Sequence, residues 1–184
     1  MATLTRQEII EALERLGQLA EVRGTKIKLA LVGGALMVLR YDAREATRDV
    51  DALILAPPEV AIVRELAQTV AAERGWPDDW LNDGAKGFLV GLSSGPLVFA
   101  AAGIEVRSPA TAQLLAMKLS AWRDDVDIND ARRLLQALLE EMPQELPGSR
   151  AAIWQAVEPY LIPGDELKAQ YAFADLWETI DDDD

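Results

Sequence analysis

Apolar residues follow two spacings along the chain, and these spacings divide it into predicted helices and strands. Near the N-terminus, Ile9, Ile10, Leu13 and Leu16 recur at the intervals of an amphipathic helix, and residues 59–74 repeat this pattern. Short apolar runs bounded by turn residues predict strands at residues 26–31, 52–55, 88–92, 97–101 and 104–106. The pattern predicts an α/β (α+β) protein with a small mixed β-sheet of four or five strands flanked by helices.

The expected domain organisation is one main domain with a helical extension. Residues 1–142 carry all the predicted strands and form the expected main domain. Pro143, Pro147 and Gly148 mark a linker, and residues 150–160 and 165–177 are predicted to form two more helices. We therefore expect residues 143–180 to pack on the main domain as a C-terminal helical extension, followed by an acidic tail at 181–184.

The amino-acid composition excludes several kinds of chemistry. The 184-residue chain contains neither cysteine nor histidine, which excludes disulfides, zinc–thiolate sites, histidine metal ligands and imidazole catalysis. Catalysis would have to use carboxylates, lysine, arginine, hydroxyl groups or a metal held by oxygen. No segment is long and apolar enough for a membrane span, and the N-terminus does not resemble a signal peptide, so the expected location is cytoplasmic.

One stretch, residues 28–55, combines two features that favour binding of phosphate and metal. An apolar strand ends at Gly33–Gly34 ahead of a short apolar helix, and backbone N–H groups in such a turn suit an anion. Asp49 and Asp51 then precede another apolar strand, so both carboxylates should lie on one side while Val50 faces the core. Two like charges repel unless a cation separates them, and Mg²⁺ (or Mn²⁺) takes such oxygen ligands. Either feature alone is more often structural, whereas their order is restrictive.

The order strand, Gly33–Gly34, short helix and Thr47-Arg48-Asp49-Val50-Asp51 resembles the signature of the nucleotidyltransferase fold. This superfamily includes DNA polymerase beta, and the closest resemblance is to its minimal, AbiEii-toxin-like members. It covers roughly residues 28–139, and the segment Trp80-Leu81-Asn82-Asp83 adds to it. From the residues alone, Trp80 could instead serve only to anchor its loop to the core.

The resemblance implies a role for each residue of the central motif. Asp49 and Asp51 would hold Mg²⁺, and Gly33–Gly34 would cradle the β,γ-phosphates of a nucleoside triphosphate. Thr47 would orient the motif, and Arg48 or Arg44 would contact phosphate. The family usually has an arginine two residues before the threonine, a position that Glu45 occupies in this chain.

The resemblance also implies roles for four residues further along the chain. Glu105 lies where polymerase-like enzymes place a third metal carboxylate. Lys118 follows a predicted helix start at Ser108–Pro109, where the family has a lysine that reaches the nucleotide phosphates, and Asp127 or Asp130 would assist the lysine or the metal. Without the resemblance, Lys118 could extend along an apolar face to water, and the two aspartates could be an ordinary acidic helix start.

These expectations lead to two hypotheses from different functional classes. The first is a nucleotidyltransferase that moves a nucleoside monophosphate from Mg-NTP to a hydroxyl of a tRNA or protein, as the toxin of a toxin–antitoxin or phage-defence pair with a cognate antitoxin. The net charge of −13 makes a tRNA acceptor less favourable than a protein. The second is a weak or inactive relative that acts as a binding module or regulatory partner.

Overall fold

The computed structural model describes residues 3–122, 125–142 and 149–181, which form two packing units. The first unit comprises Met1–Lys86 and Ser94–Pro109, and the second comprises Gly87–Ser93 and Ala110–Asp184. The contacts thus group the helices of residues 111–141 with the C-terminal helices, whereas the sequence analysis placed them with the sheet. The predicted linker at Pro143–Gly148 and the tail from residue 182 onward lie outside the described residues.

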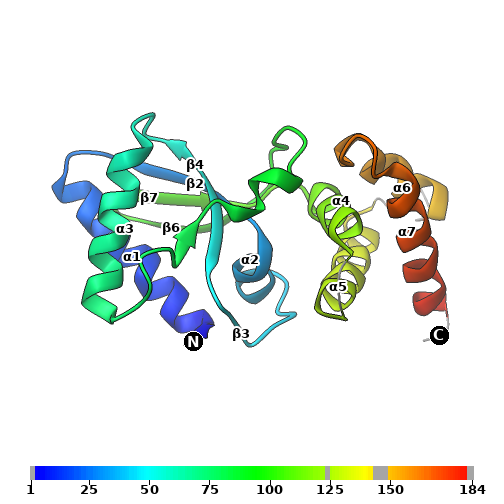
Figure 1. Ribbon diagram of the computed structural model, residues 1–184, viewed down its shortest axis with the longest axis horizontal. Coiled ribbons are helices and arrows are strands. Elements are labelled where there is room, and N and C mark those ends of the chain that lie inside the picture. Colours follow the sequence, from blue (N-terminus) through cyan, green and yellow to red (C-terminus); the bar gives the residue numbers. More distant parts are fainter. Residues whose placement is uncertain (1–2, 123–124, 143–148, 182–184) are drawn as a thin grey trace. The chain divides into compact units, whose positions relative to one another are not determined.

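The first unit contains a five-stranded mixed sheet with the strand order β5-β4-β2-β7-β6 (Figure 1). Strand β2 is antiparallel to β4 and parallel to β7, while β4 is parallel to β5 and β6 is antiparallel to β7. The fold is therefore mixed α and β, and the predicted fold class is confirmed at that level. The strands are β2 (Ile27–Leu31), β4 (Val50–Ala56), β5 (Leu81–Asn82), β6 (Leu97–Ala101) and β7 (Ile104–Arg107).

One face of this sheet is covered by the helices α1 (Arg6–Val22) and α3 (Val60–Arg74). Leu29 and Leu31 of β2 are buried on this face, in register with Val106 of β7 and Ala52 of β4. Alternation then directs the intervening residues, such as the exposed Lys28, to the other face. The apolar spacing in the sequence predicts which face of the sheet is buried. The polar residues of the motif project from the other face.

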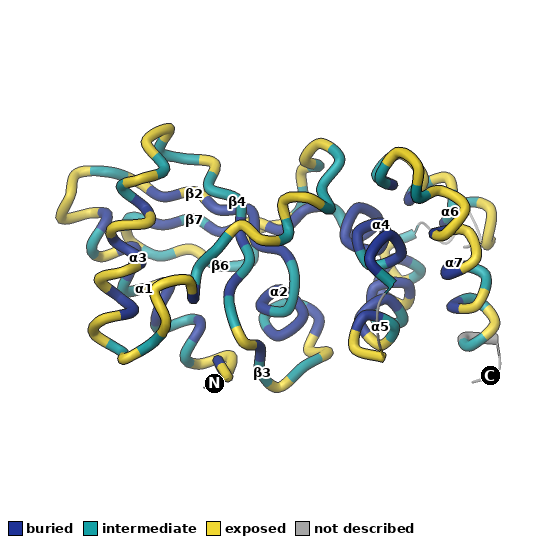
Figure 2. The backbone as a smooth tube through the Cα atoms, viewed as in Figure 1, coloured by how far each residue is buried: buried dark blue, intermediate teal, exposed yellow. Residues whose placement is uncertain are grey.

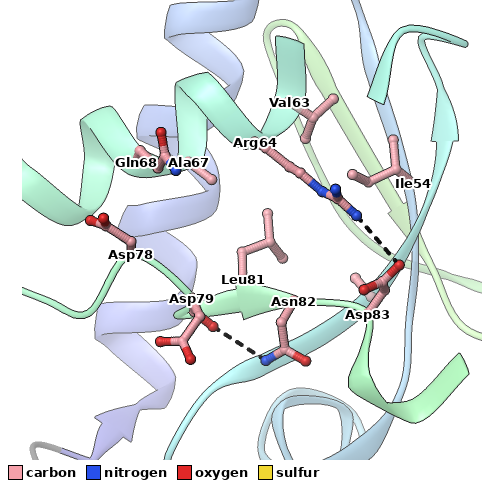
Figure 3. A pocket seen from close by; sticks show the side chains of 11 residues that line it. Ile54, Val63, Arg64, Ala67, Gln68, Asp78, Asp79, Leu81, Asn82 and Asp83 are labelled. Carbon is pink, nitrogen blue, oxygen red and sulfur yellow. Dashed lines mark hydrogen bonds and ion pairs between the residues drawn. The ribbon is translucent and has the colours of Figure 1, made fainter. Parts of the chain in front are cut away.

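Packing between α3, β4 and β5 leaves a cavity of about 210 Å³ (Figure 3). Its apolar floor includes Ala52, Ile54 and Leu81, and Arg64 extends over it to an ion pair with Asp83 at 3.7 Å. In Figure 3, Leu81 points toward Ile54, while Asn82 extends on the other side of β5. The cavity therefore lies on the α3 side of β4, opposite to the side on which Asp51 projects.

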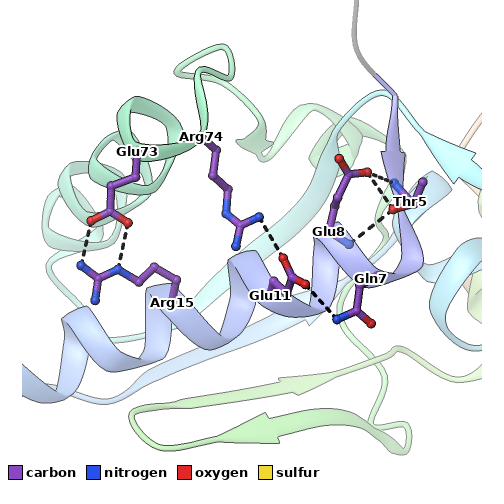
Figure 4. Close-up of polar contacts among 7 residues, drawn as sticks. All are labelled: Thr5, Gln7, Glu8, Glu11, Arg15, Glu73 and Arg74. Carbon is purple, nitrogen blue, oxygen red and sulfur yellow. Dashed lines mark hydrogen bonds and ion pairs between the residues drawn. The ribbon is translucent and has the colours of Figure 1, made fainter.

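Helix α1 begins with a capping box (Figure 4). The Thr5 hydroxyl accepts from the Glu8 backbone N–H at 3.4 Å, and the Glu8 carboxylate accepts from the Thr5 backbone N–H at 2.8 Å. These bonds satisfy two helix donors that would otherwise be without an intrahelical acceptor. Arg15 further along α1 contacts both carboxylate oxygens of Glu73 on α3, at 2.8 and 2.7 Å, and so ties the two helices together.

Two short elements position the central motif beside the sheet. Helix α2 (Gly33–Leu39) directly follows β2, as predicted, and its apolar residues are buried. Strand β3 (Ala46–Thr47) pairs antiparallel with β1 (Leu4–Thr5), which places Leu4 opposite Thr47. Neither β1 nor β3 was predicted, because two-residue strands carry no detectable periodicity.

The second unit is a helical assembly around α4 (Thr111–Ala121). Nearly all residues of α4 are buried, as expected for a central helix that contacts neighbours on several sides (Figure 2). The surrounding elements are α5 (Asp125–Glu141), α6 (Arg150–Val157), the 3₁₀ turn η2 (Glu158–Tyr160) and α7 (Glu166–Asp181). The predicted helices over 150–160 and 165–177 are confirmed. None of the helices in the described ranges has the length and apolarity needed to cross a bilayer.

The predicted strand at residues 88–92 is wrong. A 3₁₀ helix η1 spans Gly84–Phe88, and the following residues form a loop that is held by the buried side chain of Gln113. Its amide nitrogen donates to the carbonyls of Val90 and Gly91 at 3.2 and 3.1 Å, and its oxygen accepts from the Ser93 backbone N–H at 2.8 Å. Backbone groups that a β-ladder would use are therefore engaged by α4.

The predicted helix start at Ser108–Pro109 is also wrong. The Ser108 hydroxyl accepts from Arg40 at 2.8 Å and donates to the Pro109 carbonyl at 2.8 Å, so it does not cap a helix. Helix α4 begins at Thr111 after the N-cap residue Ala110, whose backbone N–H donates to the Ser93 hydroxyl at 2.8 Å. The hydrogen bond at this helix start thus comes from a residue distant in sequence, which local patterns do not reveal.

Candidate functional site

Asp49 and Asp51 lie on the same side of the sheet, as the sequence predicts. Val50 between them is fully buried, while the two aspartates are partly accessible. Asn82 of β5 stands opposite Asp51 in the parallel ladder, and its amide nitrogen donates to Asp49 Oδ2 at 2.9 Å. Directly paired residues project to the same face of a sheet, so Asn82 lies on the same face as Asp51. Because the Asn82 amide also reaches Asp49, both carboxylates lie on that face.

The glycine bend lies directly against the second carboxylate. Gly33 has a φ of +63°, a conformation that glycine adopts readily, and a Cβ built there would lie 2.8 Å from Asp51 Oδ2. The backbone N–H of Val32 donates to the Asp51 carbonyl at 2.9 Å, which extends the ladder between β2 and β4 to this point. Gly33 therefore lacks a side chain for a physical reason: the space is occupied by the Asp51 carboxylate.

The second glycine packs against Thr47. A Cβ at Gly34 would clash with the Thr47 hydroxyl and would lie 3.2 Å from an Arg44 guanidinium nitrogen. Thr47 is buried, whereas Arg48 is exposed on the surface. The structure thus brings together Gly33, Gly34, Thr47 and Asp51, and it places Arg44 rather than Arg48 against the glycine pair.

Glu105 does not join the carboxylate pair, which contradicts its predicted role as a third metal ligand. It stands opposite Lys28 in the β2–β7 ladder, while the β2–β4 ladder brings Val32 beside Asp51. The four-residue interval from Lys28 to Val32 corresponds to about 13 Å along a strand. Glu105 instead accepts a hydrogen bond from Arg107 at 2.8 Å, and that bond lowers the pKa of its carboxyl group.

Lys118, Asp127 and Asp130 form a buried ion cluster in the second unit. The Lys118 ammonium lies 2.8 Å from Asp127 Oδ1 and 2.7 Å from Asp130 Oδ2. The side chains of the two aspartates are only 5% and 2% exposed, and that of Lys118 is 16% exposed. The two aspartates lie on one side of α5, and both contact the lysine. The alternative in which Lys118 extends freely to water is excluded.

The donor chemistry of the first unit fits a divalent cation in part. Asp49 and Asp51 supply hard oxygen donors on one side of the sheet, and Mg²⁺ commonly uses one or two carboxylates together with substrate phosphates. Over the ranges that the structure describes, no three acidic side chains gather into a metal-binding group. Any cation here would therefore be held by two carboxylates and complete its coordination with water or ligand oxygens.

Comparison with known proteins does not assign this chain to a family. A scan against protein-family models gave no match, and neither did a search of curated proteins or a search of solved structures. The assignment of a function therefore rests on the sequence motif and the local geometry.

Sequence reasoning gave Asn82 no catalytic or binding role, although the structure connects it to the acidic motif. Its segment is anchored by Trp80, which is 2% exposed and whose indole nitrogen donates to the Ala67 carbonyl of α3 at 2.9 Å. The predicted anchoring role of Trp80 is confirmed. The available signal was the position of a polar residue two places after a buried tryptophan, but the strand that carries it, β5, has two residues and was too short to predict.

Proposed function

We propose that the chain is a nucleotidyltransferase that transfers a nucleoside monophosphate from a Mg-NTP to an acceptor hydroxyl. One observation carries the proposal: the Asp51 carboxylate lies against the Gly33 bend, with Asp49 on the same side of the sheet. A metal-bound triphosphate requires carboxylate oxygens and close backbone approach at one place. The motif order that resembles the nucleotidyltransferase superfamily supports the same conclusion.

In this proposal, the motif residues of the first unit each have a defined task. Asp49 and Asp51 would hold Mg²⁺, which when bound offsets negative charge on the triphosphate and orients it. The glycine pair leaves its backbone accessible because no Cβ intervenes, and Arg44 beside Gly34 supplies a positive charge at the same place. The acceptor hydroxyl would displace pyrophosphate at the α-phosphate, a reaction that depends mainly on positioning and electrostatics.

The negative charge of the chain bears on the acceptor. A net charge of −13 repels a polyanion over distance, so the proposal favours a hydroxyl on a protein over one on tRNA. An enzyme of this kind could act as the toxin of a toxin–antitoxin pair, with the cognate antitoxin as a partner. The contribution of Lys118 to phosphate binding stays a prediction, because its ammonium contacts Asp127 and Asp130 within the second unit.

The proposal is tested with a variant that carries both Asp49→Ala and Asp51→Ala. Calorimetry should detect Mg-NTP binding to the wild-type chain and lose it in the double variant. Incubation with radiolabelled nucleoside triphosphates and cell extract should label an acceptor only with the wild type. Glu105→Ala is the matched control, because it removes an acid of the same sheet face that lies away from the pair, and it should behave like the wild type. Labelling that persists in the double variant would refute the assignment of the carboxylates.

The separation of Glu105 from the pair favours one alternative, a binding module of the same fold without transferase activity. With two carboxylates instead of three, the site could bind a nucleotide without supporting transfer. This alternative predicts that Mg-NTP binds to the wild type in calorimetry while no acceptor is labelled with any of the four nucleotides. Transfer of label that depends on Asp49 and Asp51 would exclude it.

A further inference from the structure

Asn82 makes hydrogen bonds through both ends of its side-chain amide, and one of them reaches the carboxylate pair. Its nitrogen donates to Asp49 Oδ2 at 2.9 Å and to the Asp79 carbonyl at 3.3 Å. Its oxygen accepts from the Gly84 backbone N–H at 2.8 Å, which closes a short turn after β5. The amide is therefore held by its own segment on both sides while one donor is directed at Asp49.

The turn that Asn82 closes contacts the other carboxylate. The backbone N–H of Ala85 donates to Asp51 Oδ1 at 3.3 Å. A Cβ at Gly84 would lie 2.9 Å from Asn82 Oδ1 and 3.4 Å from Asp51 Oδ1, so the turn approaches closely at this point. Asn82 thus acts on Asp49 directly and on Asp51 through the turn.

Hydrogen bonds of this kind determine where a metal-binding carboxylate points. A carboxylate on a strand can rotate about its side-chain bonds, and an amide donor on one oxygen fixes the direction of the other. Partners that orient ligand side chains typically contribute 10- to 100-fold to metal affinity or activity. The parallel pairing of β4 with β5 places Asn82 opposite Asp51. This register brings Asn82 within reach of Asp49 and the following turn within reach of Asp51.

We propose that Asn82 is a positioning residue that orients Asp49, and through the Gly84–Ala85 turn Asp51, for binding of a divalent cation. This inference rests on the proposed function, because it assumes that the two carboxylates hold the cation. The inference adds Asn82, a residue of β5, to the proposed cation site on β4, and it predicts that cation binding depends on the pairing of these two strands.

The test measures Mn²⁺ affinity by electron paramagnetic resonance and calorimetry on the full-length chain, so it needs no catalytic activity. Asn82→Ala should weaken Mn²⁺ binding about 10- to 100-fold. Asn82→Ser is the second variant, because a hydroxyl can still accept from Gly84 but is too short to reach Asp49; it should also weaken Mn²⁺ binding, by no more than Asn82→Ala does. Asp79→Ala is the control, because it removes an exposed neighbouring carboxylate and keeps the backbone carbonyl; its affinity should remain within about threefold of wild type.

The outcomes separate this inference from the proposed function. If the Asp49→Ala/Asp51→Ala variant loses Mn²⁺ while both Asn82 variants retain wild-type affinity, the positioning role is refuted and the proposed function stands. If the wild type binds no Mn²⁺, or the double variant binds it equally well, the proposed function and this inference both fail. Amide exchange at Ala85 in the metal-free chain gives a further readout, since Asn82→Ala should accelerate it.

Discussion

Replacing Lys118 with methionine should destabilise the second unit strongly. The substitution keeps the length and apolar part of the side chain but removes the charge that contacts Asp127 and Asp130. Both carboxylates are almost completely buried, and removing one partner of a buried ion pair typically costs about 3–5 kcal/mol. That range corresponds to an increase of about 150- to 5,000-fold in the population of the open state.

Hydrogen exchange followed by mass spectrometry measures this change for α4 and α5 separately from the first unit. The amides of both helices should lose protection by about two to four orders of magnitude in Lys118→Met, on the scale just given. Lys168→Met is the matched control in the same unit, because Lys168 is exposed and donates to the neutral carbonyls of Ser120 and Ala121, so its loss leaves no buried carboxylate without its lysine and should cost less than Lys118→Met.

A second substitution separates the charge effect from packing. Adding Asp127→Asn to Lys118→Met removes one of the two buried charges that have lost Lys118, so it should recover about 1 kcal/mol or more of the lost stability. A loss of under about 1 kcal/mol in Lys118→Met would refute the reasoning. So would a double variant that is less stable than the single one, because that result would assign the cost to shape and not to charge.

Two further predictions test the packing of the first unit. Arg15 holds the pKa of Glu73 below its ordinary value, chiefly by hydrogen bonding (Figure 4), so this bridge stabilises above that value and is lost as the pH falls through the lowered pKa. Wild type should therefore melt higher than Glu73→Gln at pH 7, and thermal denaturation should show the difference vanish in acid. Trp80→Phe removes the hydrogen bond to the Ala67 carbonyl and should cost about 1–3 kcal/mol in urea unfolding. Trp76→Phe, at a half-exposed site, should cost less than about 1 kcal/mol.

The predictable parts of the fold were those in which a single period runs over many residues. Helices α1 and α3 and strands β2 and β7 follow from apolar spacing, because each buries one face against the same core. The prediction failed where a distant side chain replaced local backbone bonding. Gln113 holds the loop at residues 90–93, and Ser93 supplies the contact that starts α4, so no local pattern could reveal either.

The candidate site shows the same division. Strand alternation correctly placed Asp49 and Asp51 on one side, and the chain order correctly placed Gly33 beside them. Glu105 was misplaced, because the apolar run of β7 gives its strand but not its register against β2. Asn82 received no role in the candidate site, because that role depends on the pairing of β5, a strand of two residues, with β4.

The electrostatics of the carboxylate pair explain why the proposed cation site has to be tested by measuring cation affinity and not by measuring the stability of the protein. Asp49 and Asp51 are two strand positions apart, about 7 Å, and their repulsion is about 2 kcal/mol at an effective dielectric constant of about 20. Asn82 and the Ala85 N–H each donate to one of them, and a hydrogen bond to a charged group contributes about 1.5–3 kcal/mol. The two donors together offset the repulsion, so the fold can assemble the pair before a cation arrives. The acids therefore form a preorganised pair, and their fit to a cation is measured by Mn²⁺ affinity in the Asn82 variants.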